Sequence, residues 1–147
     1  MWPAVAKQKA EIKSYFHKKW TKAWNAYKEA RQTKIWFPIP DIKKSVQLLN
    51  MKRCNLSRIV QFITGHNNLK RNRNIQNGVN DPESCRLCQE DEESSYHVIA
   101  ECPAMQYFRG KIFQTPTLLP DPPVWTVMQI DRFLRESPIG DMLDNME

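Results

Sequence analysis

The chain has 147 residues, of which 41% are hydrophobic, 10% aromatic and 26% charged, and these proportions exclude a fully disordered protein. No stretch approaches the roughly 18 apolar residues of a membrane span, and the first residues lack the apolar segment of a signal peptide. The net charge of +6 divides unevenly: residues 1–80 carry 17 Lys/Arg and three acids, a balance of +14, whereas residues 81–147 carry −8. Such a basic half favours a polyanionic partner.

Residues 7–31 predict an amphipathic helix. Its apolar positions recur at steps of three and four, and its lysines lie mostly off that stripe. Such a helix can cover an apolar partner while it presents cations to phosphates. For the two tryptophans we expect the simpler outcome, which is burial in the core. The stripe consists of Ile12, Phe16, Trp20, Ala23, Trp24 and Tyr27.

Two shorter helices follow a connector. Residues 32–40 contain two prolines and predict an extended segment. Asp41 is placed to cap a helix that ends near Leu49. Asn55 is placed to cap the next helix, which Gly65 would end. The pair has the proportions of a helix-turn-helix motif, although paired short helices are common in any α domain.

The rest of the chain divides around a cysteine cluster. The basic run 70–74 could grip phosphates or form a solvated loop, and turns follow at 77–78 and 80–82. Residues 103–113 predict a helix, 114–123 a proline-rich linker and 124–135 a last amphipathic helix, after which residues 137–147 should dock weakly or fray. We expect three segments: a basic helical part (7–80), a zinc knuckle with its following helix (81–113), and a linker with a C-terminal amphipathic helix (114–147). The predicted fold class is all-α, a small helical bundle with a Cys₃His zinc knuckle.

Cys85-x₂-Cys88-x₈-His97-x₄-Cys102 is the strongest motif. A Cys-x₂-Cys turn provides two of the four tetrahedral ligands of zinc, and a short helix around 96–102 would provide the other two. Four protein ligands leave no open position, so the ion would be structural. A redox Cys-x₂-Cys would need a βαβ setting, which is absent here.

Other candidate residues have simpler interpretations. The acidic segment 90–93 should project into water. Cys54 has no partner nearby and predicts a small buried hydrophobe. His66 follows a helix end, where its cation would suit the helix dipole, and His17 should lie on the surface.

Taken together, the motifs resemble the carboxy-terminal tail of the polyprotein of non-LTR (LINE, jockey-type) retrotransposons, downstream of the reverse transcriptase and RNase H-like parts. The resemblance covers roughly residues 10–137. It rests on the Trp20-x₃-Trp24 helix, the segments 31–38 and 62–67, the cysteine cluster with its Glu-Glu-Ser-Ser-Tyr-His stretch, Cys102-Pro103 with Arg109, and residues 133–135.

This resemblance implies an origin in a mobile element and a tail that helps to hold template RNA or target DNA. It implies no chemistry, because the chain has no Tyr-x-Asp-Asp and no cluster of acids for two-metal catalysis in its first 80 residues. Relatives often carry a histidine where this chain has Asn72, which leaves a second metal position unsupported. A truncated element and a host-adopted domain are both compatible with the sequence.

We therefore expect a non-catalytic, zinc-containing protein that binds RNA or DNA through backbone phosphates and acts in the nucleus or the cytoplasm. It should have no membrane partner and no small-molecule substrate. The alternative is a protein-interaction module with a structural zinc site, whose basic half docks an acidic partner. The predicted nucleic-acid contacts are Lys70, Arg71 and Arg73, followed by Lys43, Lys44, Lys52, Arg53 and Arg58.

Overall fold

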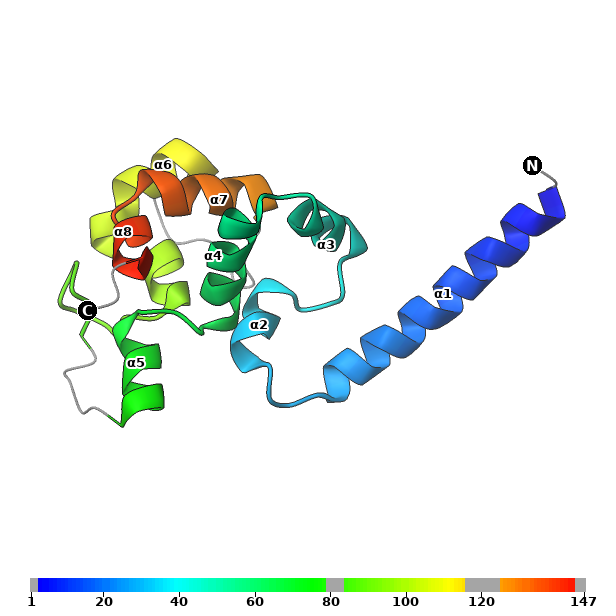
Figure 1. The fold of residues 1–147 in the computed structure, drawn as a ribbon, viewed down its shortest axis with the longest axis horizontal. Coiled ribbons are helices and arrows are strands. Elements are labelled where there is room, and N and C mark those ends of the chain that lie inside the picture. Colours follow the sequence, from blue (N-terminus) through cyan, green and yellow to red (C-terminus); the bar gives the residue numbers. More distant parts are fainter. Residues whose placement is uncertain (1–2, 79–83, 116–124, 145–147) are drawn as a thin grey trace.

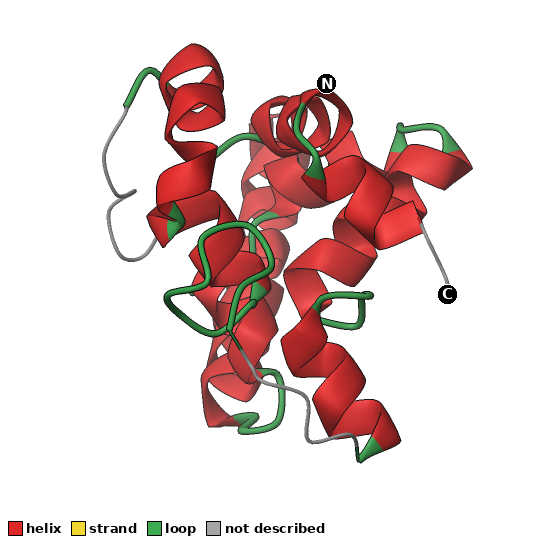
Figure 2. Ribbon diagram, turned by 90° about the vertical axis from the view of Figure 1, so that its left-hand side faces the viewer, coloured by secondary structure: helices red, strands yellow, loops and turns green. Residues whose placement is uncertain are grey.

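The computed structural model describes residues 3–78, 84–115 and 125–144. Helices and loops make up these residues, and no strand occurs among them (Figures 1 and 2). One isolated bridge joins Ser84 to Glu92 beside the cysteine cluster. The predicted all-α class is confirmed.

The helices follow the chain in a simple order. They are α1 (Pro3–Ala26), α2 (Arg31–Trp36), α3 (Ile42–Leu49), α4 (Arg53–Thr64), α5 (Lys70–Asn77), the π-helical turn η1 (His97–Glu101), the 3₁₀ turn η2 (Pro103–Met105), α6 (Gln106–Phe113), α7 (Val127–Glu136) and α8 (Ile139–Asp144). None of these described helices combines the length and the apolar character that a bilayer span requires.

An aromatic cluster in the core joins residues of the first and last predicted segments of the chain. The Trp36 ring packs on Phe62 of α4 at 5.6 Å and on Trp125 at 5.9 Å between ring centroids. The Trp125 indole also donates a hydrogen bond to the Trp36 carbonyl oxygen at 3.1 Å. Aromatic pairs of this kind add stabilisation beyond their buried area. The core is therefore continuous, with residues from all three predicted segments.

Helix α7 lies at the centre of the body and packs against α3, α4, α6 and α8. A capping box between Thr126 and Gln129 fixes its first turn. The expectation that residues 137–147 dock weakly is wrong for the described part, because Ile139 and Leu143 of α8 are buried in the core. The six-residue helix is short, yet it places two large aliphatic side chains on one face.

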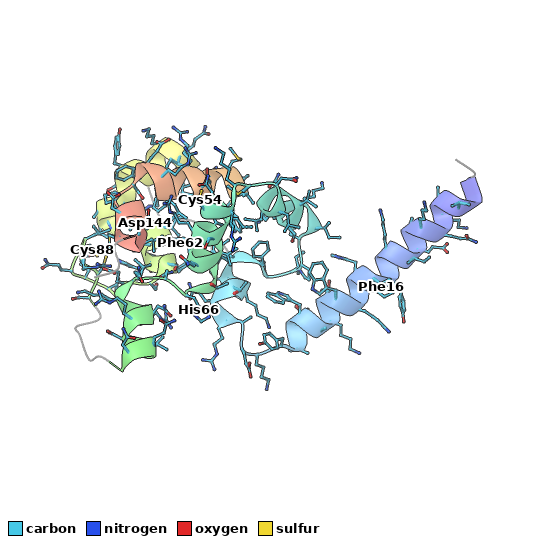
Figure 3. All side chains as sticks on the ribbon, viewed as in Figure 1. Phe16, Cys54, Phe62, His66, Cys88 and Asp144 are labelled. Atoms are coloured by element: carbon cyan, nitrogen blue, oxygen red, sulfur yellow. The ribbon has the colours of Figure 1, made fainter. Side chains whose placement is uncertain are left out.

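Helix α1 leaves its apolar stripe largely exposed, so the expected burial in the core is wrong for Trp20 and only partly met by Trp24. It extends away from the other helices (Figure 1), and its 24 residues span about 36 Å. Ile12, Phe16 and Trp20 are 57%, 62% and 46% exposed, and Phe16 projects from the helix far from the body (Figure 3). The Trp24 indole, which is partly buried, anchors the end of α1 by donating to the Phe37 carbonyl at 2.8 Å.

Several predicted elements begin elsewhere or take another form. Residues 31–36 are helical and not extended, because the prolines at 38 and 40 act only after α2 has ended. Helix α3 has the predicted Asp41 cap, whose side chain accepts from the Lys44 backbone N–H. Helix α4 begins at Arg53, before the expected cap Asn55, and ends as predicted at Gly65, whose φ of 77° suits glycine.

The outcome is mixed for the remaining segments. The basic run 70–74 forms the first part of helix α5, and residues 103–113 are helical as predicted. The last amphipathic helix is confirmed, beginning at Val127. Most of the predicted linker 114–123 and the turn at 80–82 lie outside the described residues.

Candidate metal centre

The four predicted ligands converge. The ligand atoms of Cys85, Cys88, His97 and Cys102 all lie within 4.8 Å of one another. Sulfurs bound to one tetrahedral zinc are roughly 3.8 Å apart, given Zn–S bonds of about 2.3 Å. The Sγ atoms of Cys85 and Cys102 are 4.0 Å apart, and the Cys88 Sγ lies 3.3 Å from the His97 Nε2. The cluster therefore has the dimensions of a four-coordinate metal site.

A tight turn presents the first two thiols. The Gln89 N–H donates to the Cys85 carbonyl at 2.7 Å, and Gln89 itself has a φ of 61°, which reverses the chain. The Cys85 N–H donates to the Asp91 carbonyl at 2.7 Å and closes the loop beyond the turn. These backbone bonds fix both sulfurs on the same side of the turn.

A π-helical turn presents the other two ligands. In an α-helix, residues five apart point roughly 140° away from each other. In η1 the Cys102 N–H instead donates to the His97 carbonyl, five residues earlier, at 2.7 Å. Because the wider turn brings the two side chains to one side, both can reach the same ion. Single π turns are frequent at functional sites, and no pattern in the sequence predicts this one.

The thiols have different proton affinities. Burial raises the pKa of Cys85, and burial also raises the pKa of Cys102, to about 12. The pKa of Cys88 falls to about 7, because burial, which raises it, is outweighed by backbone N–H groups and by His97. A cation that binds the cluster must displace protons from the two buried thiols, so acidic conditions should weaken its binding.

Arg109 is a buried cation beside the ligands. Only 3% of it is exposed, and its guanidinium donates to the Cys102 carbonyl at 2.8 Å. Three thiolates and a neutral imidazole around a dication carry a net charge of −1. With a divalent ion bound, Arg109 would balance that charge inside the protein, a role that neither its sequence position nor its residue type predicts alone.

Glu93 contradicts the expectation that the acidic segment 90–93 projects into water. Its side chain is 0% exposed. Its carboxylate accepts from the Arg86 guanidinium at 2.6 Å and from the backbone N–H groups of Lys70 and Arg86 at 3.0 and 2.8 Å. Burial raises its pKa, and these partners outweigh it and leave the pKa lowered. Glu93 thus connects helix α5 to the turn that carries the cysteines.

The remaining single candidates are on the surface or partly so. Cys54 is exposed and not a core residue, because it lies in the first turn of α4 on its outer face (Figure 3). His66 and His17 are exposed. Asn72 donates from its side chain to the Asn67 carbonyl at 2.7 Å and so supports the local backbone.

The predicted nucleic-acid contacts do not form one patch. Helices α3 and α5 lie apart, separated by α4 (Figure 1). Several cations also have protein partners: Arg58 pairs with Asp144, Arg71 with Glu92, and the Lys44 ammonium lies 4.2 Å from the Trp125 ring centroid. The Lys70 ammonium donates to the Ser84 carbonyl at 3.1 Å. Exposed positions among the predicted contacts are Arg71, Arg73, Lys43, Lys52 and Arg53.

Comparison with protein families, with curated proteins and with solved structures gave no match. The geometry of the site therefore carries the functional argument.

Arg109→Met should weaken metal binding about tenfold while leaving all four ligands in place, because it removes the buried charge that balances the site. Chelator competition at neutral pH measures this change. Lys111→Met is the control: it removes an exposed charge from the same helix and should change the affinity for the metal less than twofold. Equal effects of both variants would contradict a local role for Arg109.

Glu93→Gln should detach α5 from the cysteine turn and accelerate amide hydrogen exchange in residues 70–77. Because folding lowers the pKa of Glu93, its stabilisation is present above its ordinary value of 4.5 and is lost as the pH falls through the lower folded value. The variant should therefore lose this part of the acid dependence of stability. The exposed Glu90→Gln should change neither property, and unaltered exchange in Glu93→Gln would refute the link.

Proposed function

We propose that this chain is a non-catalytic, zinc-containing protein that binds RNA or DNA through backbone phosphates, in the nucleus or the cytoplasm. The resemblance to the tail of LINE-type polyproteins adds the proposal that it descends from a mobile element. The proposed ion is zinc, because three sulfurs and one imidazole in a tetrahedral set suit that metal. With four protein ligands the ion has no position for a substrate, so its role is structural.

The single observation that carries the nucleic-acid proposal is the exposed surface of α1. The helix carries Lys7, Lys9, Lys13, Lys18, Lys19 and Lys22 against one acid, Glu11, and all of these residues are exposed. Exposed aromatic rings lie among the lysines: Tyr15, Phe16 and Trp20 are 55%, 62% and 46% exposed.

Cations interleaved with aromatic faces are the pattern that suits single-stranded nucleic acid. The lysines neutralise phosphates and release counterions, while bases stack on the rings. At helical spacing, Lys9, Lys13 and Trp20 fall on nearly the same side of α1 as Phe16. A purely cationic face opposite a purely apolar one would instead favour a membrane surface.

The same helix gives a specific reason to consider a protein partner. An apolar stripe that is exposed over several turns can also dock in a groove of an acidic protein. Cross-linking mass spectrometry after nuclease treatment separates the two functions: contacts that survive nuclease favour the protein partner, and contacts that disappear favour nucleic acid.

Binding of a labelled 20-nucleotide single strand, followed by fluorescence anisotropy between 50 and 200 mM salt, tests the proposal. Affinity should fall steeply with salt, and Lys13→Met should reduce the slope of log K against log salt by roughly 0.7. Trp20→Ala should instead cost about 1–3 kcal/mol at every salt concentration with the slope unchanged, because it removes stacking and not charge.

Lys111→Met, which removes a charge from the acidic half of the chain, serves as the control and should behave like the unaltered protein. Affinity that is indifferent to salt, or α1 variants that bind like the unaltered protein, would defeat the proposal.

A further inference from the structure

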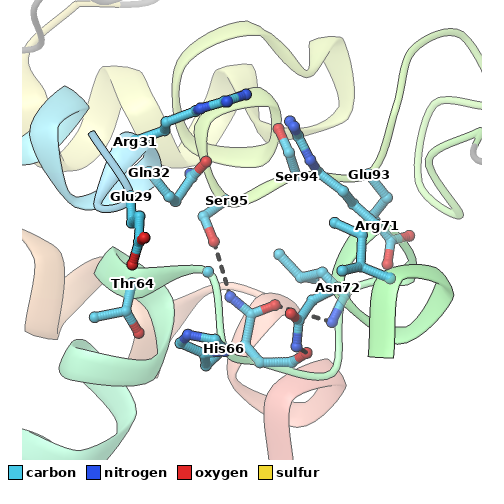
Figure 4. Close-up of a pocket in the computed structure, with 14 residues that line it drawn as sticks. Glu29, Arg31, Gln32, Thr64, His66, Arg71, Asn72, Glu93, Ser94 and Ser95 are labelled. Atoms are coloured by element: carbon cyan, nitrogen blue, oxygen red, sulfur yellow. Dashed lines mark hydrogen bonds between the residues drawn. The ribbon is translucent and has the colours of Figure 1, made fainter. Parts of the chain in front are cut away.

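A second concave site lies between α2, the connection from α4 to α5, and the segment that contains Ser94 and Ser95 (Figure 4). It has a volume of about 250 Å³, and none of the four metal-ligand residues lines it. Most of the residues that line it are polar in type, with Arg31 on one side and Arg71 on the other. The function proposed above uses only α1 and the surface cations, so this cavity is unassigned.

The floor of the cavity is rigid. Asn67 is 7% exposed, and its side-chain amide donates to the Ser95 hydroxyl at 2.8 Å, which Figure 4 draws as a dashed line. The same side chain accepts from the Leu69 N–H at 3.0 Å, and its backbone carbonyl accepts from Asn72 at 2.7 Å. These bonds join the α4–α5 connection and the start of α5 to the segment that contains Ser95, so this side of the cavity is formed without a ligand.

The cavity has hydrogen-bond donors that lack acceptors. The Nε2 of Gln32 is buried without a hydrogen-bond partner, although buried polar groups in proteins are nearly always paired. Arg31 forms no ion pair within the described ranges. Arg71 uses one terminal nitrogen on Glu92, at 3.0 Å, which leaves the rest of its guanidinium available.

The carboxylates of the lining do not cancel these donors. Glu93 is fully occupied by Arg86 and by backbone N–H groups, as described above. Glu29 lies on the exposed rim and accepts from the Tyr27 hydroxyl at 3.2 Å. A ligand that suits the cavity must therefore supply acceptor oxygens to at least three donors, and an anionic ligand suits them best.

We propose that this pocket binds the phosphate of one nucleotide in the bound nucleic-acid strand. Guanidinium groups and a primary amide are donors that suit phosphate oxygens. The volume is slightly below the range of about 300–1,000 Å³ for drug-sized ligands, and it suits a phosphate with its sugar. The exposed Ile75 and His66 on the rim then meet the base. This inference rests on the proposed function.

The test is a titration of the ¹⁵N-labelled full chain with adenosine monophosphate, adenosine and inorganic phosphate. We expect adenosine monophosphate to shift the Gln32 side-chain amide signals saturably, with adenosine binding at least tenfold more weakly. No shift of the Gln32 signals at millimolar adenosine monophosphate overturns the proposal. Inorganic phosphate that binds as tightly as the nucleotide overturns the assignment to a nucleotide.

Charge variants make the test specific to the pocket. Arg31→Met and Arg71→Met should each weaken binding of adenosine monophosphate about tenfold. Lys111→Met, which removes an exposed cation outside the pocket lining, should change it less than twofold. Glu29→Gln should strengthen binding two- to threefold, because it removes a negative charge from the rim. Equal effects of the Arg71 and Lys111 variants would contradict a pocket.

Failure of this inference can be told from failure of the proposed function. Lys13→Met on α1 should weaken binding of the 20-nucleotide strand and leave binding of adenosine monophosphate unchanged. If the strand binds while the nucleotide does not, the pocket assignment is wrong and the nucleic-acid proposal stands. If neither binds, both are wrong.

Discussion

The constraint on which the arrangement depends is the mutual proximity of three thiols and an imidazole in a largely buried cluster. Without a cation, burial keeps the protons on Cys85 and Cys102, and the proximity of the four side chains adds little to the stability of the fold. With a divalent ion bound, the two turns that carry the ligands would be joined through the ion. In small metal modules the free energy of metal binding contributes directly to the free energy of folding. Arg109 would then balance the charge from the α6 side, and Glu93 extends the same unit to α5.

The chain thus has two parts with different physical roles. The body, held by Trp36, Phe62, Trp125 and the metal cluster, is closely packed and positions α5 and the polar cavity. Helix α1 leaves most of its apolar and cationic surface in solvent, so helix propensity and its anchor at Trp24 support it without the burial that stabilises ordinary helices. A surface of that kind gains stability when a partner covers it.

Local patterns in the sequence predicted the features that depend on neighbouring residues or on strict ligand spacing. Asp41 and Gly65 mark helix ends because capping involves only neighbouring residues, and the ligand spacing predicted the cysteine cluster because zinc geometry is strict. The predictions that failed concern residues whose surroundings are determined by distant parts of the chain. Glu93 looks like any surface acid until Arg86 and the start of α5 enclose it, and Trp20 looks like core until α1 proves to extend away from the other helices. The π turn at His97 left no signal, because a single five-residue turn is too short to show in the periodicity of the sequence.

Native mass spectrometry of the reduced, purified full chain, together with elemental analysis, tests the central claim most directly. The account predicts one zinc ion per chain, with Cys88→Ala binding at least a hundredfold more weakly. Because Cys88 is partly ionised at neutral pH, binding should release between two and three thiol protons. A stoichiometry near zero in the unaltered protein after reconstitution with zinc would contradict it, as would Cys88→Ala that holds zinc as tightly as the unaltered chain.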